Sequence, residues 1–385
     1  MPTYYIHIKG IVQGVGFRPT IYRLADKYQL KGTVSNTTDG VQIYFNATAK
    51  KSSLFFNDIK SHPPSRAVVT SIEIQETEKR EYEGFQIIDS HGGKDRSVLL
   101  TPDFAICDEC RSEMYDSNNK RYHYPFITCT LCGPRYSIIN ALPYDRPLTT
   151  MDTFNMCPDC QYEYDDIEDR RYFSQTNTCP ECSIKLSVSG QSGNVIPISS
   201  VIQAWKQDLI VAIKGIGGYL LTCDATSEHA INKLRQKKNR PSKPLAVMYP
   251  DAAMLKKDLE ISSEAISELT NHVSPIVLTR SKKTPGTGMV KAAIAPGLNQ
   301  IGVMVPYAPL MDLLLHHFKK PIIATSGNLS GDPIEFRNDR AMDNLSEIAD
   351  LFLHNNRGIV VPQDDSLIAF SPRHHRKIIL RRSRG

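Results

Sequence analysis

Eight of the nine cysteines in this 385-residue chain form four CxxC pairs. Two cysteines separated by two residues can turn both thiolates toward one metal ion, and two such pairs complete a tetrahedral site of four sulfurs. The sequence therefore predicts two structural zinc ions, with no coordination position left open for water. The predicted ligands are Cys107, Cys110, Cys129, Cys132, Cys157, Cys160, Cys179 and Cys182.

The cysteine pattern is duplicated, since its second half repeats the first at an offset of 50 residues, as from Cys107 to Cys157. A disulfide framework is the alternative, but CxxC spacing suits zinc better and the N-terminus lacks the features of a secretion signal. The segment up to Cys182 is poor in aliphatic residues, so we expect the metals to supply its folding energy. Cys223, outside the pattern, is predicted to be a core residue. Four further pairs share the offset: Glu113 and Glu163, Arg121 and Arg171, Tyr122 and Tyr172, and Thr128 and Thr178.

A glycine-rich stretch near the N-terminus, GIVQGVGFRPT, spans residues 10–20 and is followed by KGTVSNTTDGV at residues 31–41. Glycines let a loop point backbone N–H groups at an anion, and the dipole of a following helix adds to the attraction. The stretch therefore predicts a phosphate site, although a plain strand-to-helix turn with an exposed arginine is the alternative. The predicted phosphate-binding loop is Gln13, Gly14, Val15, Gly16 and Phe17, ending at Arg18.

Basic residues concentrate in the C-terminal half, although the net charge is only +5. The run KLRQKKNRPSK at residues 233–243 has no acidic residue, and an apolar strand follows it. A second feature is ATSGNLSG, in which Ser326 and Asn328 follow another apolar strand. The basic run could be a solvated face, a nucleic-acid groove or a polyphosphate pocket. The basic run and ATSGNLSG both lie next to apolar strands, and ligands bind at strand ends in α/β sheets. This position favours a pocket for a nucleoside triphosphate.

Three domains position these residues. Residues 1–91 show a βαββαβ pattern, which predicts a ferredoxin-like α+β sandwich. Residues 101–187 hold the duplicated zinc-finger module, and residues 196–385 predict an α/β domain. Ser/Gly-containing segments, SHGGKDRS and SVSGQSGN, are the predicted linkers. The sandwich is expected to have strands near 4–10, 31–36, 41–45, 68–76 and 84–89, with helices near 19–28 and 52–60.

The α/β domain alternates apolar strands with amphipathic helices. Expected strands include 209–215, 244–249, 274–279 and 320–327, and expected helices include 227–238 and 308–318. No apolar run approaches the length that spans a bilayer, and the N-terminus has no basic region followed by a long apolar core. We therefore expect a cytoplasmic protein without a membrane partner.

The order of these segments resembles one family along the entire chain. Residues 4–90 are similar to acylphosphatases, the last domain is similar to YrdC-like domains, and the cysteine module lies between them. The whole chain resembles the N-terminal half to two-thirds of the HypF family, the carbamoyltransferases of nickel-iron hydrogenase maturation. VAIKGIGGY, QDDSLI and LRRSRG also look like signatures of that family.

The resemblance implies roles for particular residues. The acylphosphatase motif places the phosphate-binding arginine at Arg18 and the water-orienting asparagine at Asn36. The YrdC-like K-x-R and S-x-N patterns imply ATP binding by Lys238, Arg240, Ser326 and Asn328. Lys214 is a further implied ATP contact, although a lysine capping a strand end is an equal alternative. Asp364 and Asp365 could hold magnesium or basic neighbours, or lie in a solvated turn.

The activity implied by the resemblance has two steps. Carbamoyl phosphate is hydrolysed to carbamate at the acylphosphatase-like site. ATP, with magnesium bridging its phosphates, then adenylates carbamate at the YrdC-like site to give carbamoyl-AMP and pyrophosphate. The product serves cyanide-ligand synthesis, and the partner protein HypE receives the carbamoyl group.

Two departures from the family pattern qualify these expectations. Family members continue after RRSRG into a C-terminal transfer domain, whereas this chain stops at Gly385. We therefore expect either a piece of a longer protein or a transfer step carried by another chain. In the second zinc repeat, Phe173 replaces the usual histidine and Ser183 replaces the usual glycine after Cys182. The zinc ligands are retained, but the histidine of the family pattern is not.

Other classes of function fit part of the pattern. A zinc module beside a basic YrdC-like domain could bind RNA or make threonylcarbamoyl-adenylate for tRNA modification. The Arg18 and Asn36 pair argues against these alternatives, because an RNA binder has no use for it, and we expect no nucleic-acid partner. A non-catalytic scaffold for hydrogenase maturation is the third reading, and it would show no turnover.

Overall fold

The computed structural model describes residues 1–90, 92, 98–189, 196–329, 331–371, 373–374 and 376–384. The chain forms two compact units, which are described separately. The first comprises Met1–Pro102, Thr128–Leu131 and Ile138–Cys182, and the second comprises Asp103–Ile127, Cys132–Ser137 and Ser183–Gly385. Most of the two predicted linkers lies outside the described residues.

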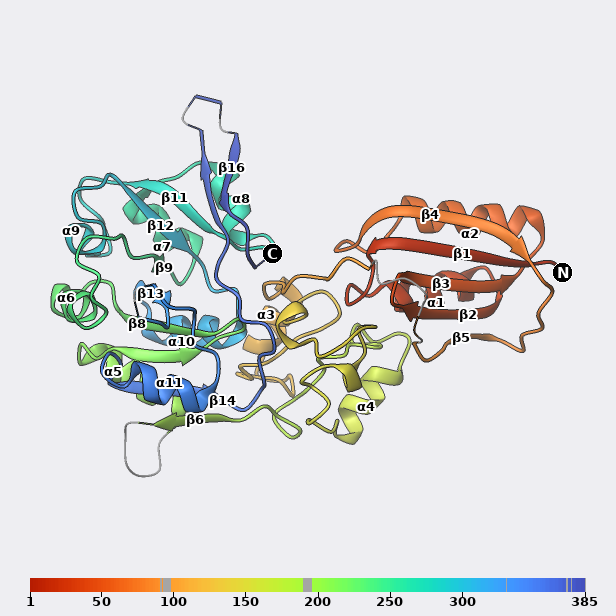
Figure 1. The fold of residues 1–385 in the computed structure, drawn as a ribbon, viewed down its shortest axis with the longest axis horizontal. Coiled ribbons are helices and arrows are strands. Elements are labelled where there is room, and N and C mark those ends of the chain that lie inside the picture. Colours follow the sequence, from red (N-terminus) through yellow and green to blue (C-terminus); the bar gives the residue numbers. More distant parts are fainter. Residues whose placement is uncertain are drawn as a thin grey trace. The chain divides into compact units, whose positions relative to one another are not determined.

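The first unit contains the predicted sandwich (Figure 1). Its five-stranded sheet has the order β4-β1-β3-β2-β5, antiparallel except for the parallel pair β2 and β5. This confirms the ferredoxin-like class, with β5 added at the edge. The elements are β1 (Thr3–Ile11), α1 (Phe17–Lys27), β2 (Lys31–Thr37), β3 (Gly40–Asn46), α2 (Ala49–Ser61), β4 (Val68–Thr77) and β5 (Phe85–Ile87).

Alternation along β1 produces the core of this sandwich. Ile6 and Ile8 are completely buried, as strand periodicity requires of residues two apart on one face. The Phe45 ring on β3 meets the Phe55 ring on α2 edge to face, with centroids 5.0 Å apart. Helix α2 begins where the Thr48 hydroxyl accepts a hydrogen bond from a backbone N–H of its first turn. These contacts hold α2 against the sheet, and the glycine-rich loop follows β1 of that sheet.

The duplication predicted from the cysteines is visible in the backbone. Helix α3 (Asp108–Tyr115) follows Cys107, and helix α4 (Pro158–Asp165) follows Cys157. His123 and Phe173 occupy equivalent positions, and both have left-handed backbone conformations, with φ of 53° and 54°. Two short 3-10 turns, η1 (Tyr136–Ile138) and η2 (Arg146–Leu148), complete this segment.

The second unit contains a long mixed sheet in the order β16-β15-β11-β12-β9-β13-β8-β7-β14-β6, with β10 paired to β11. This confirms an α/β architecture. Its strands are β6 (Leu186–Ser189), β7 (Val211–Lys214), β8 (Tyr219–Asp224), β9 (Val247–Met248), β10 (Leu259–Glu260), β11 (Ile276–Ser281), β12 (Gln300–Met304), β13 (Ile322–Ser326), β14 (Leu351–Asn355), β15 (Leu367–Phe370) and β16 (Lys377–Arg381).

Helices cover both faces of this sheet (Figure 1). Leu220 and Leu221 of β8 belong to different core clusters, because neighbouring strand residues point to opposite faces. One cluster includes residues of α6, α7, α8, α9 and α11, and the other includes residues of α5 and α10. The helices are α5 (Pro197–Lys206), α6 (Glu228–Lys237), α7 (Ala252–Asp258), α8 (Ser263–Thr270), α9 (Lys291–Ile294), α10 (Pro309–Phe318) and α11 (Asn338–Leu345).

Two boundaries differ from the sequence prediction. Residues 187–189 were expected in a linker but belong to β6, which pairs with β14. The sheet of the second unit therefore begins before residue 196. Helix α1 begins at Phe17, two residues earlier than expected, because the helical conformation extends across Pro19, which suits a first turn. Within the described residues, no helix has the length and apolar character needed to cross a bilayer.

Candidate functional site

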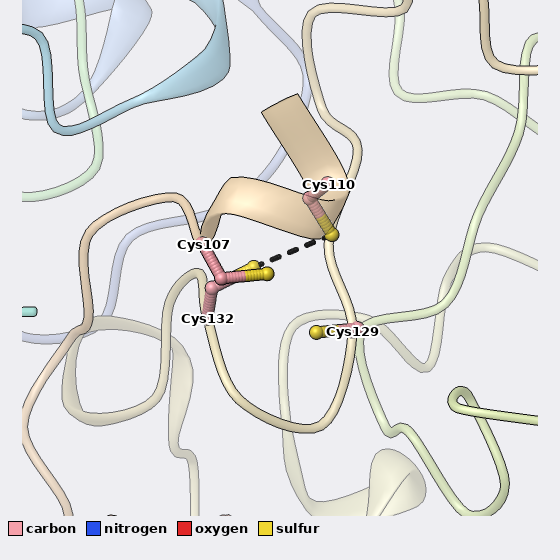
Figure 2. Close-up of side chains that lie close together, drawn as sticks. All are labelled: Cys107, Cys110, Cys129 and Cys132. Carbon is pink, nitrogen blue, oxygen red and sulfur yellow. Dashed lines mark hydrogen bonds between the residues drawn. The ribbon is translucent and has the colours of Figure 1, made fainter. Parts of the chain in front are cut away.

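The eight paired cysteines form two clusters of four sulfurs. In the first cluster, Cys107, Cys110, Cys129 and Cys132 converge (Figure 2), and their sulfurs lie within 4.8 Å of one another. The Cys110 and Cys132 sulfurs are 3.6 Å apart. A tetrahedral zinc site with Zn–S bonds of about 2.3 Å places its sulfurs about 3.8 Å apart, whereas a disulfide requires about 2.0 Å. The geometry therefore fits zinc and excludes a disulfide.

The second cluster has the same geometry. Sulfur separations are 3.6 Å for Cys157 and Cys179 and 3.7 Å for Cys160 and Cys182. The first pair of each cluster lies at a helix N-terminus, where the helix dipole stabilises thiolates. The two four-cysteine clusters are thus compatible with two structural zinc ions. Cys223 is completely buried in the core of the second unit, as expected of a small apolar residue.

The structure brings Arg18 and Asn36 into direct contact. When the Asn36 amide is oriented so that its oxygen faces Arg18, the oxygen accepts hydrogen bonds from Nε at 3.1 Å and Nη2 at 3.2 Å. Arg18 is 7% exposed and Asn36 is 1% exposed, so both are enclosed. Gly14 and Gly16 have φ of 69° and 76°, which side-chain-bearing residues rarely adopt. The loop before α1 therefore requires these glycines.

The side chains of Gln13, Val15 and Phe17 in the same loop are buried. Val15 and Phe17 point into the core and are 0% and 2% exposed. The Gln13 side chain donates to the backbone oxygens of Thr37 at 2.7 Å and Gly40 at 3.0 Å. Because these bonds fix Gln13 to the β2–β3 turn, its amide holds the loop in shape rather than facing a ligand.

Sequence reasoning missed the residues that surround Arg18. Its Nη2 donates to Asp145 Oδ1 at 2.6 Å, and its guanidinium lies 5.7 Å from the centroid of the Phe173 ring. The backbone oxygen of Tyr144 lies 3.5 Å from the same Nη2 atom. Asp145 is 127 residues away in the sequence, and no motif or spacing in that stretch signals the contact. Phe173 departs from the family pattern, but nothing in the sequence indicates that it lies beside Arg18.

The basic run and the S-x-N pattern meet in the second unit. Lys238 ends α6 and is 1% exposed. Its Nζ donates to the backbone oxygens of Ser326 at 2.5 Å and Asn328 at 2.6 Å, and to Asn328 Oδ1 at 2.8 Å. The Ser326 hydroxyl also donates to Asn328 Oδ1 at 2.8 Å. Arg240 reaches the same strand, with Nη1 donating to Thr325 Oγ1 at 3.1 Å.

Burial disfavours the charged forms of the cations in this cluster. Burial, with Arg240 and Lys243 as smaller causes, lowers the pKa of Lys238 to about 7. Burial also lowers the pKa of Arg240 from its usual value. A polyphosphate against these groups would favour their charged forms, because an opposite charge stabilises a cation. The basic residues named at the sequence level thus lie together with Ser326 and Asn328 in one buried cluster.

Lys214 lies at the same edge of the sheet but has other partners. It pairs in register with Tyr219 on β8, and the next β8 residue pairs with Ser326 on β13. Its Nζ donates to Asn338 Oδ1 at 2.8 Å and to the Asn355 backbone oxygen at 3.2 Å. Burial, followed by the charge of Arg357, lowers the pKa of Lys214 to about 8.

The two aspartates of QDDS have basic neighbours. Arg381 Nη1 lies 2.6 Å from Asp364 Oδ2, and Arg384 donates to Asp365 Oδ1 at 3.2 Å. Burial raises the pKa of Asp365 from its usual value. Of the three explanations given by the sequence, the structure supports pairing with arginine.

Known proteins resemble the chain along its whole length. Family profiles match residues 4–87 (acylphosphatase), residues 106–139 and 156–189 (HypF finger), and residues 203–383 (telomere recombination, the Sua5, YciO and YrdC family). The carbamoyltransferase HypF of Synechocystis is 43% identical over 390 residues, covering 100% of this chain and 50% of that protein. The chain belongs to the HypF family.

A solved structure supports the same relationship. Full-length HypF in a phosphate- and nucleotide-bound form is 42% identical, with a TM-score of 0.95, and the match covers 100% of this chain and 50% of that one. The chain thus spans about half the length of these HypF relatives. The threonylcarbamoyl-AMP synthase of Vibrio vulnificus is 30% identical over 135 residues, covering 35% of this chain and 73% of that enzyme.

Proposed function

We propose that this chain hydrolyses carbamoyl phosphate to carbamate and phosphate, and then adenylates carbamate with ATP to give carbamoyl-AMP and pyrophosphate. The observation that carries the proposal is the contact of Arg18 with Asn36 on an acylphosphatase-like sandwich. We further place the product in cyanide-ligand synthesis for nickel-iron hydrogenases, with a HypE-like maturation protein as acceptor of the carbamoyl group.

Hydrolysis relies on positioning and charge. The planar guanidinium of Arg18 binds two phosphoryl oxygens, and backbone N–H groups of the loop 13–17 bind the others. In this step Arg18 exchanges its present hydrogen bonds for bonds to the substrate. Asn36 holds the attacking water in line with phosphorus. Carbamate is a good leaving group, so orientation and charge stabilisation account for most of the rate increase.

Adenylation uses the cationic cluster of the second unit. Lys238 and Arg240 neutralise the triphosphate of ATP, which enters as its magnesium complex, while Ser326 and Asn328 orient it. The carbamate oxygen attacks the α-phosphorus, the bond to the bridging oxygen of pyrophosphate breaks, and pyrophosphate leaves with the electron pair. Lys214, two strands from Ser326 at the same sheet edge, is the proposed contact at the far side of the nucleotide.

The threonylcarbamoyl-AMP synthase relative supports a second candidate for the α/β domain. That activity would combine threonine, bicarbonate and ATP without using the Arg18 site. A scaffold without turnover is the third candidate. The enclosed Arg18–Asn36 pair favours the two-step reaction, because neither alternative uses it.

The deciding assay measures pyrophosphate release. With ATP alone the full chain should release little pyrophosphate, and added carbamoyl phosphate should raise the rate at least tenfold. Threonine with bicarbonate should give no such increase. Pyrophosphate release that requires threonine would establish the synthase alternative, and no release under either condition would establish the scaffold.

ATP affinity should fall as the pH rises. Because the pKa of Lys238 in the free protein is about 7, this lysine is mostly neutral at pH 8, and binding a polyphosphate requires it to take up a proton. Affinity should therefore weaken at least about tenfold between pH 7.5 and pH 9, as measured by calorimetry in buffers of different ionisation enthalpy. Lys238→Arg should remove most of this dependence, because an arginine keeps its charge. The same slope in wild type and variant would contradict the assignment.

A further inference from the structure

Asp145 has no role in the hydrolysis proposed above, yet it makes the shortest contact of Arg18. Its Oδ1 atom accepts from Arg18 Nη2 at 2.6 Å, and its side chain is 22% exposed. Among the described residues, none donates a hydrogen bond to Oδ2. Oδ2 of Asp145 can therefore accept a further hydrogen bond. It lies beside the Arg18 guanidinium, where the phosphoryl group is expected to bind.

The position of Asp145 is fixed from both sides. The backbone N–H of Tyr144 donates to Gln13 Oε1 at 3.0 Å, and the backbone N–H of Arg146 donates to Gln175 Oε1 at 2.7 Å. Arg146 is held in turn by hydrogen bonds from its guanidinium to the backbone oxygens of Phe154, Gln175 and Asn177. Because Gln13 belongs to the glycine-rich loop, its hydrogen bond to Tyr144 connects the backbone next to Asp145 directly to that loop.

A carboxylate at this position opposes the binding of phosphate. It repels the phosphoryl oxygens and competes with them for Arg18. Ionised carboxylates only accept hydrogen bonds, and the neighbouring Tyr144 carbonyl oxygen, 3.5 Å from Arg18 Nη2, is also an acceptor. The group that suits these acceptors is an N–H donor. A carbamoyl group carries two N–H donors, whereas the methyl group of acetyl phosphate carries none.

We propose that Asp145 is the specificity-determining residue of this site, accepting a hydrogen bond from the amino group of carbamoyl phosphate and so selecting it over other acyl phosphates. The inference rests on the proposed function and names the substrate feature that the site reads. The Phe173 ring lies over the Arg18 guanidinium, with its centroid 5.7 Å from the central carbon, so Asp145 and Phe173 both border Arg18. A site that hydrogen-bonds a substrate N–H rejects an analogue that lacks it.

The test compares two substrates on the full chain. Phosphate release should show kcat/KM at least about tenfold higher for carbamoyl phosphate than for acetyl phosphate, the range expected for one hydrogen bond to a charged group. Asp145→Ala should reduce this ratio at least about tenfold by lowering the rate with carbamoyl phosphate. Asp145→Asn, which keeps one acceptor oxygen, should lie between them. Asp152→Asn, an exposed acidic residue of the same segment, should leave the ratio unchanged.

The inhibition constant for inorganic phosphate distinguishes two roles of Asp145: selecting the carbamoyl group, or only competing with phosphate for Arg18. If Asp145 only occupies Arg18, the variants will bind phosphate more tightly and hydrolyse both substrates faster by the same factor, which overturns the inference. Equal kcat/KM for both substrates in the wild type also overturns it while leaving the proposed hydrolysis intact. Hydrolysis of neither substrate by the wild type refutes the proposed function itself. Zinc content and circular dichroism of each variant identify any that fail to fold.

Discussion

Replacing Arg18 with alanine should reduce carbamoyl-phosphate hydrolysis about a thousandfold or more. The guanidinium supplies a charge and several donors to the transferred phosphoryl group, and loss of a single preorganised donor already costs about a hundredfold to a thousandfold. Pyrophosphate release that depends on carbamoyl phosphate should disappear with it. ATP binding should be unchanged, because Arg18 belongs to the first unit and Lys238 to the second. Phosphate and pyrophosphate release, with calorimetry for ATP, measure all three effects.

Two further variants separate the role of the Arg18 guanidinium from a general loss of charge. Arg18→Lys keeps a charge but loses the planar fork, so its activity should remain nearer to that of the alanine variant than to wild type. Arg23→Ala removes an exposed arginine of the same helix and should retain hydrolysis. Added ammonium carbamate should restore pyrophosphate release in Arg18→Ala, because the second site is intact. Hydrolysis within tenfold of wild type would show that Arg18 does not bind the reacting phosphoryl group.

The features that could be predicted from sequence depend on local spacing. A CxxC pair constrains two thiolates within one turn, so the eight ligands could be named before their arrangement was known. Alternation in β1 and the glycines at 14 and 16 likewise have local physical causes. Lys238, Asn328 and Ser326 could be named from two short motifs, and the structure brings these motifs together.

The unpredicted features are contacts between distant parts of the chain. Nothing local to Asp145 indicates that it lies 2.6 Å from Arg18, since the fold alone brings the two together. The ion pairs of Asp364 and Asp365 depend similarly on how β15 and β16 pair, with Arg381 opposite Leu367. Burial also lowers the pKa values of Lys214 and Lys238, and the sequence neighbours of these lysines alone do not predict that burial. Tertiary packing therefore determines what each named side chain can do.

Removing one zinc ligand should unfold one metal site and leave the other. Cys160→Ser breaks the second cluster, and metal analysis should fall from close to two zinc ions per chain to close to one. The apolar cluster around this site consists of its four cysteines and Met156, so hydrophobic burial contributes little to the stability of the segment. Structural zinc contributes about 10 kcal/mol or more in small zinc modules, far more than such a cluster can supply. Cys129→Ser should have the corresponding effect on the first cluster.

Loss of the second zinc should also change the substrate preference of the Arg18 site. Asn177 donates to the backbone oxygen of Cys160, and Arg146 donates to the backbone oxygens of Asn177 and Gln175. These bonds hold the segment that carries Asp145, so Cys160→Ser should lose the preference for carbamoyl phosphate while ATP affinity persists. Cys223→Ser is the matched control, because this buried cysteine lies outside both clusters and its variant should keep two zinc ions. Two zinc ions in Cys160→Ser would refute the ligand assignment, whereas one zinc with unchanged selectivity would show that the metal does not position Asp145.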